Sequence, residues 1–271
     1  MTDFLDRVVA ERRADVAAAR ERVPEDELRA FAMPRARSSA GAAFQLALRA
    51  RSRGGLAVIA EVKRVSPALG VLNAAVDPAV LALAYVAAGA AAISVLTEPR
   101  HWGGSLEDLK RVREAVDVPI LCKDIIVSSY QLYEARAAGA DAALLIAEAL
   151  SDAELRQLVA ECERLGMTAF VEAHEPVAFG RAVASGATVV GINARDLRDP
   201  SVLDVGRARQ LHSFARPEQI LVAESGIGSA DDARLLPRRV DAVLVGTALM
   251  RAADPAPLIR GIVSARRTVT V

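Results

Sequence analysis

The sequence is poor in aromatic residues, in cysteine and in net charge, and each shortage argues against a class of protein. Aromatic side chains make up 4% of the 271 residues, and 34 basic side chains are balanced by 34 acidic ones. Nucleic-acid binding calls for a basic surface or for stacked aromatic side chains, so we expect no nucleic-acid partner. The two cysteines, Cys122 and Cys162, are too few for a disulfide framework. They are typical of a protein from a reducing compartment.

Hydrophobic residues make up 52% of the chain, which predicts one folded domain over residues 1–271 with a sizeable core. The first residues show no basic segment followed by an apolar one, so we expect no secretion signal and a cytoplasmic location. Residues 78–97 carry no charge and are long enough to span a membrane. They are rich in alanine and interrupted by Gly89, so a helix ending near Ala88 and a strand from Ala91 explain them better. We expect no membrane association.

Lysine is scarce, because 31 of the 34 basic residues are arginine and only Lys63, Lys110 and Lys123 are lysine. A buried lysine can change its pKa and exchange a proton, whereas arginine stays charged. A lysine in so arginine-rich a chain is therefore a candidate for proton transfer. Lys110 lies in a polar helical stretch and is interpreted as a surface residue. For Lys63 and Lys123, their position in the fold decides between a surface role and proton transfer.

Short apolar runs alternate with helical stretches rich in Ala, Arg and Glu, at the spacing of strand–helix units. Eight runs occur, at residues 56–63, 91–97, 119–124, 142–147, 168–173, 189–194, 220–225 and 242–247. Gly89, Gly139 and Gly186 each stand between a helical stretch and the next run, where a left-handed residue ends a helix. The runs are apolar on both faces, as buried parallel strands are. Eight units with no spare strand predict a (β/α)8 barrel.

Residues 1–45 precede this repeat and form an N-terminal extension. Phe4, Leu5, Val8 and Val9 recur at helical spacing, and Pro24 precedes an acidic turn that starts a second helix. We therefore expect two helices packed on the barrel. They either cap its bottom or close over its mouth.

Charged side chains gather where the predicted strands end, and barrel enzymes carry their active sites at the C-terminal ends of strands. Glu61 and Lys63 end the first run and share one face because they are two residues apart. Lys123 ends the third run, Glu172 the fifth and Asn193 the sixth. A single charge at a strand end is commonly just where a strand meets water. The coincidence of two lysines with two glutamates favours an acid–base site.

The seventh and eighth runs lead into glycine-containing loops at residues 225–229 and 246–248. Glycines there let backbone N–H groups approach an anion, and barrels commonly bind phosphate at this place. We therefore predict a phosphorylated small-molecule substrate. The residues expected to hold its phosphate are Ser225, Gly226, Gly246 and Thr247.

Other chemistries find little support. The three histidines lie far apart without the spacing of metal ligands, and neither a Walker loop nor a dinucleotide fingerprint occurs. We expect neither a metal nor a cofactor. Cys122 alternates away from Lys123 and is interpreted as a wall residue rather than a nucleophile. Trp102 either packs on the barrel rim or covers an aromatic substrate.

The chain resembles the indole-3-glycerol phosphate synthase family over nearly its whole length, and several segments carry the resemblance. They are residues 59–64 followed by Ser66-Pro67, and residues 94–98, 104–109, 119–124, 171–174, 191–197, 224–227 and 243–246. Members of that family convert 1-(2-carboxyphenylamino)-1-deoxyribulose 5-phosphate to indole-3-glycerol phosphate, with loss of CO2 and water and without a cofactor.

The resemblance implies a role for each candidate residue. Lys123 would be the general acid that protonates the ribulose carbonyl while the ring carbon attacks it. Lys63 would hold the substrate carboxylate and assist as the hydroxyl leaves, and Glu172 would be the general base of the dehydration. The order in which the two lysines act stays open. Glu61 and Asn193 would orient the lysines and the substrate hydroxyls.

The remaining candidates would bind the substrate. Ser66 and Arg195 would fix the anthranilate end, which Trp102 and Ile125 would line. The four loop residues named above would bind the phosphate.

The chain departs from the family pattern at a few positions. Where the family usually has Ser-Lys-Gly after Ser-Pro, this chain has Ala68-Leu69-Gly70, and Ile125 replaces an aromatic residue. Ala194 and Ala248 replace an asparagine and a serine. None removes a catalytic group, so the expected effect is on KM rather than kcat. The departures also fit a paralogue that acts on a modified anthranilate adduct.

Two further alternatives stay open. A sugar-phosphate isomerase would need no second lysine. A barrel without turnover would bind a phosphorylated ligand only, since fold does not prove function. The sequence leaves the oligomeric state between a monomer and a weak homodimer.

Overall fold

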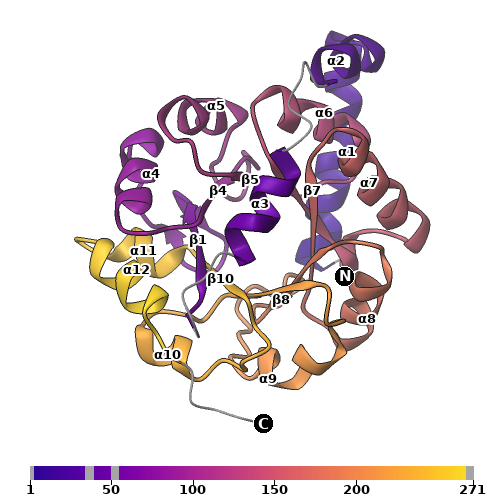
Figure 1. The fold of residues 1–271 in the computed structure, drawn as a ribbon. Coiled ribbons are helices and arrows are strands. Elements are labelled where there is room, and N and C mark those ends of the chain that lie inside the picture. Colours follow the sequence, from indigo (N-terminus) through magenta and orange to yellow (C-terminus); the bar gives the residue numbers. More distant parts are fainter. Residues whose placement is uncertain (1–2, 34–39, 50–54, 267–271) are drawn as a thin grey trace.

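The computed structural model describes residues 3–33, 40–49 and 55–266. Eight parallel strands close into a barrel in the order β1-β10-β9-β8-β7-β6-β5-β4. They are β1 (Ala57–Val62), β4 (Ala92–Leu96), β5 (Ile120–Lys123), β6 (Ala142–Ile146), β7 (Thr168–Ala173), β8 (Val189–Asn193), β9 (Ile220–Glu224) and β10 (Ala242–Val245). Each lies within one of the eight predicted runs, so the predicted (β/α)8 barrel is confirmed (Figure 1).

Helices follow the strands and surround the barrel (Figure 1). They are α4 (Pro78–Ala87), α5 (Leu106–Ala115), α6 (Ser129–Ala137), α7 (Asp152–Arg164), α8 (Pro176–Ala184), α9 (Arg207–Leu211), α10 (Ala230–Arg234), α11 (Thr247–Arg251) and α12 (Ala256–Val263), with short 3-10 turns η1 (Ala147–Ala149) and η2 (His212–Phe214). The loop after β1 carries a small antiparallel hairpin, β2 (Val65–Ser66) and β3 (Gly70–Val71). Gly89 and Gly139 have φ values of 103° and 99°, as predicted for residues that end helices.

Residues along each strand alternate between two apolar layers. In β1, Ala57 and Ile59 pack inside the barrel with residues such as Phe170. Val58 and Ala60 pack outside it, against the helices. Burying one large apolar side chain stabilises the folded protein by roughly 1.5–3 kcal/mol. The alternation also fixes which residues face the barrel axis at the strand ends.

The uncharged stretch at residues 78–97 folds as predicted, into α4 followed by β4. No helix in the described part of the chain is long and apolar enough to cross a membrane.

The described residues of the N-terminal extension form three helices, α1 (Phe4–Arg22), α2 (Glu25–Ala32) and α3 (Ala40–Arg49), so the prediction of two helices over residues 1–45 was one helix short. α3 closes the N-terminal end of the barrel and crosses the ring of strands in Figure 1. Its Phe44 and Leu48 are fully buried against the barrel interior. The N–H of Gly41 donates to the Gly166 oxygen, just before β7, at 2.8 Å.

α1 lies at the opposite end of the barrel. The Phe4 N–H donates to the Arg198 oxygen, in the loop after β8, at 3.1 Å. Arg12 forms an ion pair with Asp124, which follows β5. The extension therefore covers both ends of the barrel, and the two placements considered from the sequence each apply to a different helix.

Candidate active site

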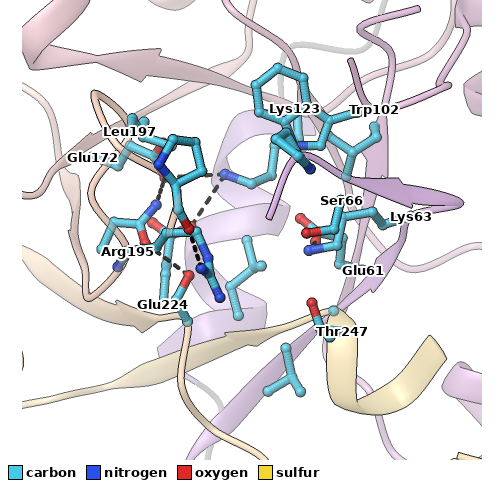
Figure 2. A pocket seen from close by; sticks show the side chains of 18 of the residues that line it. Glu61, Lys63, Ser66, Trp102, Lys123, Glu172, Arg195, Leu197, Glu224 and Thr247 are labelled. Atoms are coloured by element: carbon cyan, nitrogen blue, oxygen red, sulfur yellow. Dashed lines mark hydrogen bonds and ion pairs between the residues drawn. The ribbon is translucent and has the colours of Figure 1, made fainter. Parts of the chain in front are cut away.

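A cavity of about 410 Å³ opens at the C-terminal ends of the strands, and all thirteen residues predicted to form the site line it (Figure 2). They are Glu61, Lys63, Ser66, Trp102, Lys123, Ile125, Glu172, Asn193, Arg195, Ser225, Gly226, Gly246 and Thr247. The inward register explains this convergence. Glu61 continues the inward series of Ala57 and Ile59, and Lys123 follows inward Leu121 by two residues.

Lys63 is paired with Glu61 on one side of the cavity. Its Nζ lies 3.0 Å from Glu61 Oε1, and the glutamate is almost completely buried. A side chain at Gly246 would collide with this carboxylate, so the loop after β10 needs glycine there. The other oxygen of Glu61 has no hydrogen-bond partner among the described residues. The Lys63 ammonium group is thus held by a carboxylate whose second oxygen is buried without a partner.

Lys123 lies between two carboxyl groups. Its Nζ is 3.1 Å from Glu172 Oε2 and 3.3 Å from Glu224 Oε2, and Figure 2 shows both interactions as dashed lines. Burial alone would lower the pKa of Lys123, but the negative charges of Glu172, Glu224 and Glu61 outweigh it and raise the pKa above its ordinary value. Lys123 therefore carries its proton at neutral pH.

Glu224, at the end of β9, was not assigned a role from the sequence. Burial and the nearby charge of Glu172 raise its pKa well above the ordinary value of 4.5. Its Oε1 has no hydrogen-bond partner among the described residues. From the sequence, Glu224 was noted only within the segment at residues 224–227. Its inward register brings it to the site, because Val222, two residues earlier, packs inside the barrel.

Asn193 connects the acid–base groups to the loop after β9. Its Nδ2 donates to Glu172 Oε2 at 3.4 Å. Its Oδ1 accepts the Ser225 hydroxyl at 2.9 Å and the Arg195 N–H at 3.0 Å. Both ends of the amide are thus engaged, so its orientation is fixed.

The loop after β9 turns through two successive left-handed residues, Ser225 with a φ of 66° and Gly226 with a φ of 74°. Ser225 is the one non-glycine residue with positive φ in the described ranges. Such a conformation costs about 1–2 kcal/mol, and it concentrates at ligand-binding sites. Thr247 and Arg251, from the first and last positions of α11, line the same part of the cavity. Arg251 had not been singled out in the sequence.

Part of the cavity lining is apolar. Trp102 and Ile125 contribute to it together with Leu144, Ile146 and Leu197. Trp102 also packs edge-on against Phe4 of α1, with ring centroids 5.9 Å apart. It therefore both packs on the barrel rim and faces the cavity.

Arg195 reaches the cavity from the loop after β8. Its Nη1 donates to the Pro200 oxygen at 2.5 Å, and burial lowers its pKa from the ordinary value. The guanidinium is thus held by its own loop beside the cavity. Ser66, in β2, is buried at the cavity wall.

The described residues contain no group of three His, Cys, Asp or Glu side chains arranged to hold a metal ion. The C-terminal ends of the strands place two lysines, three glutamates and an asparagine in the cavity. The barrel and this cavity define an enzyme that works by acid–base chemistry. The indole-3-glycerol phosphate synthase family model matches residues 5–262, and the chain belongs to that family.

Curated relatives agree with this assignment. The chain is 46% identical over 268 residues to indole-3-glycerol phosphate synthase of Streptomyces griseus, covering 96% of this chain and 95% of the relative. It is 54% identical over 207 residues to that of a Nocardioides species, covering 76% of this chain and 79% of the relative. The crystal structure of 3-hexulose-6-phosphate synthase from Salmonella typhimurium is similar with a TM-score of 0.60. At 16% identity, covering 78% of this chain and 98% of that chain, it supports the fold alone.

Proposed function

We propose that this cavity converts 1-(2-carboxyphenylamino)-1-deoxyribulose 5-phosphate to indole-3-glycerol phosphate, the reaction of the family to which the chain belongs. The substrate loses one CO2 and one water and gains a ring bond. The observation that supports this mechanism best is the contact between the protonated Lys123 and Glu172. Both line the same cavity as Lys63.

Lys123 acts first as general acid in this proposal. The ring carbon that bears the carboxylate attacks the ribulose carbonyl carbon, and the carbonyl oxygen takes the proton of Lys123. Loss of CO2 then restores the aromatic ring. Glu172 and Glu224 stabilise the ammonium form of Lys123 between turnovers.

Dehydration follows at the same carbon. Lys63 assists the hydroxyl as it leaves, and Glu172 takes the proton from the neighbouring carbon, so that water departs and the pyrrole double bond forms. Glu61 holds Lys63 in place, and Asn193 holds Glu172.

The two ends of the cavity bind the two ends of the substrate. Trp102 and Ile125 cover the anthranilate ring, and Ser66 and Arg195 fix its polar groups. The left-handed turn at Ser225 and Gly226, with Gly246 and Thr247 from the next loop, binds the phosphate.

We also propose that residues 1–271 form a single domain that works in the cytoplasm as a monomer or weak homodimer. Its balanced charge supports the absence of a nucleic-acid partner.

The test is turnover of the substrate by purified protein, followed by indole fluorescence. We expect a rise in the native protein and in Lys110→Ala, whose side chain is on the surface, and none in Lys123→Ala. No rise with folded native protein would contradict this substrate, and substituted anthranilate adducts would then be tried. Product binding without turnover of any adduct would support a ligand-binding barrel instead.

A further inference from the structure

The C-terminal ends of β6, β7, β8 and β9 are joined by a row of hydrogen bonds through side chains. Glu148, which follows β6, accepts the backbone N–H groups of His174 and Glu175 at 2.7 and 3.0 Å. The His174 ring, through Nδ1, lies 2.9 Å from the backbone oxygen of Asn193. Ser225, after β9, donates its hydroxyl to the Asn193 side chain at 2.9 Å. The row therefore ties together the ends of four neighbouring strands, and its members Asn193 and Ser225 line the cavity.

The His174 side chain links β7 to β8 just beyond the last residue pair of the sheet. The regular pairing of β7 with β8 stops at Ala173 opposite Ile192. His174 and Asn193 are the next residues along the two strands, and the imidazole ring joins them in place of a backbone hydrogen bond. The Asn193 backbone is thus held by the residue that directly follows β7, the strand that carries Glu172. The Asn193 side chain in turn donates a hydrogen bond to Glu172.

The partners of the His174 ring define its protonation state. The Asn193 oxygen can only accept, so Nδ1 carries a hydrogen. Arg207 Nη2 lies 3.3 Å from Nε2, and a guanidinium can only donate, so Nε2 offers a lone pair. The nearest carboxylate to that nitrogen, Asp196, is 4.0 Å away, beyond hydrogen-bond reach. The ring is buried, with both nitrogens engaged.

We propose that His174 is a positioning residue. As the neutral Nδ1–H tautomer, it fixes the end of β8 so that the Asn193 amide keeps Glu172 in line for proton transfer. This rests on the proposed function, because Glu172 is the base of that reaction. The Asn193–Glu172 hydrogen bond is already 3.4 Å long, so a small shift of the Asn193 backbone breaks it.

Two substitutions separate this role from simple packing. An asparagine places its amide nitrogen near the position of Nδ1, whereas a glutamine places its amide near Nε2. We expect His174→Asn to keep kcat within about threefold of the native value, because the bond to Asn193 is restored. His174→Gln loses that bond, and we expect kcat to fall about ten- to a hundredfold with little change in KM. His212→Gln, in η2 and outside the cavity lining, is the matched control.

Equal losses of kcat in the two His174 variants would overturn the proposal, as would native kcat in His174→Gln. Melting temperatures of both variants accompany the kinetics, because a packing role alone would lower these temperatures without separating asparagine from glutamine in kcat.

The tautomer can be observed without turnover. The chain has three histidines, so ring-15N-labelled protein gives a simple NMR spectrum that the His174→Asn and His212→Gln variants assign. We expect the His174 ring at neutral pH to carry its hydrogen on Nδ1 and none on Nε2. A hydrogen on Nε2 would overturn the proposal even if the native protein is fully active. Absence of native activity with the expected spectrum would instead contradict the proposed function.

Discussion

Arg12 and Asp124 form a partly buried, two-pronged ion pair that joins the N-terminal extension to the end of β5. Arg12 Nε and Nη2 each donate at 3.0 Å, one to each oxygen of the carboxylate. Asp124 directly follows Lys123, and it also accepts the Thr97 hydroxyl at 2.7 Å. Burial raises the pKa of Asp124, and Arg12 is the strongest of the groups that oppose this rise. The first helix therefore holds the residue beside the proposed general acid.

Removing the Arg12 charge should destabilise the protein. Arg12→Met leaves a buried carboxylate without its cation, and we expect the free energy of unfolding to fall by about 3 kcal/mol. Arg13→Met breaks the exposed pair with Glu154, and we expect a change below about 1 kcal/mol. Urea denaturation measures both. Similar losses in the two variants would mean that the Arg12 pair contributes no more than a surface pair.

Arginine should not replace Lys123. A guanidinium keeps its charge but is a poor proton donor, so we expect kcat of Lys123→Arg to fall by about a hundredfold or more. Steady-state kinetics by indole fluorescence measure this change. Near-native turnover in Lys123→Arg would exclude proton donation by this residue.

Two glycines should respond in opposite ways to alanine. A side chain at Gly246 collides with the Glu61 carboxylate, so we expect Gly246→Ala to lower kcat/KM about tenfold or more. Gly180, inside α8, has open space around an added methyl group, so Gly180→Ala should raise the free energy of unfolding by about 0.4–1 kcal/mol. Kinetics and denaturation on both variants check the pair. Unchanged kcat/KM in Gly246→Ala would mean that the Glu61–Lys63 geometry tolerates displacement.

Glu224 should make stability depend on pH. Burial and the charge of Glu172 raise its pKa, so the folded protein binds this proton more tightly than the unfolded chain does. Its contribution to stability is complete below the ordinary pKa of 4.5 and is lost as the pH rises toward the folded value. Glu224→Gln does not titrate, so we expect it to gain stability relative to the native protein as the pH rises above about 4.5. Thermal unfolding across this range measures the difference, and a constant difference would contradict the prediction.

The sequence predicts the barrel and the composition of the site because both follow from local pattern. Apolar runs give the strands, and a spacing of two residues carries Lys63 inward with Glu61. Gly89 and Gly139 mark helix ends because few other residues adopt their backbone conformation.

What the sequence does not predict depends on residues brought together by closure of the barrel. Lys123 and Glu224 lie on β5 and β9, which are not neighbours in the sheet. Their contact therefore cannot be predicted from the pairing of adjacent strands. The position of α3 is set by Phe44 and Leu48, which fill an end of the barrel that exists only once the strands have closed. The pairing of Arg12 with Asp124 likewise joins residues 112 positions apart.

The placement of α1 and α3 at opposite ends of the barrel bears on the order in which the protein assembles. Phe4 and Gly41 leave the ribosome well before Arg198 and Gly166, whose backbone oxygens accept their N–H groups. Phe44 and Leu48 have no completed barrel end to enter until the later strands have been made. Helices α1 and α3 are synthesised before the parts of the barrel that they contact, so they are among the last to reach their native contacts. Their apolar residues stay exposed to water, or bound to a chaperone, until then.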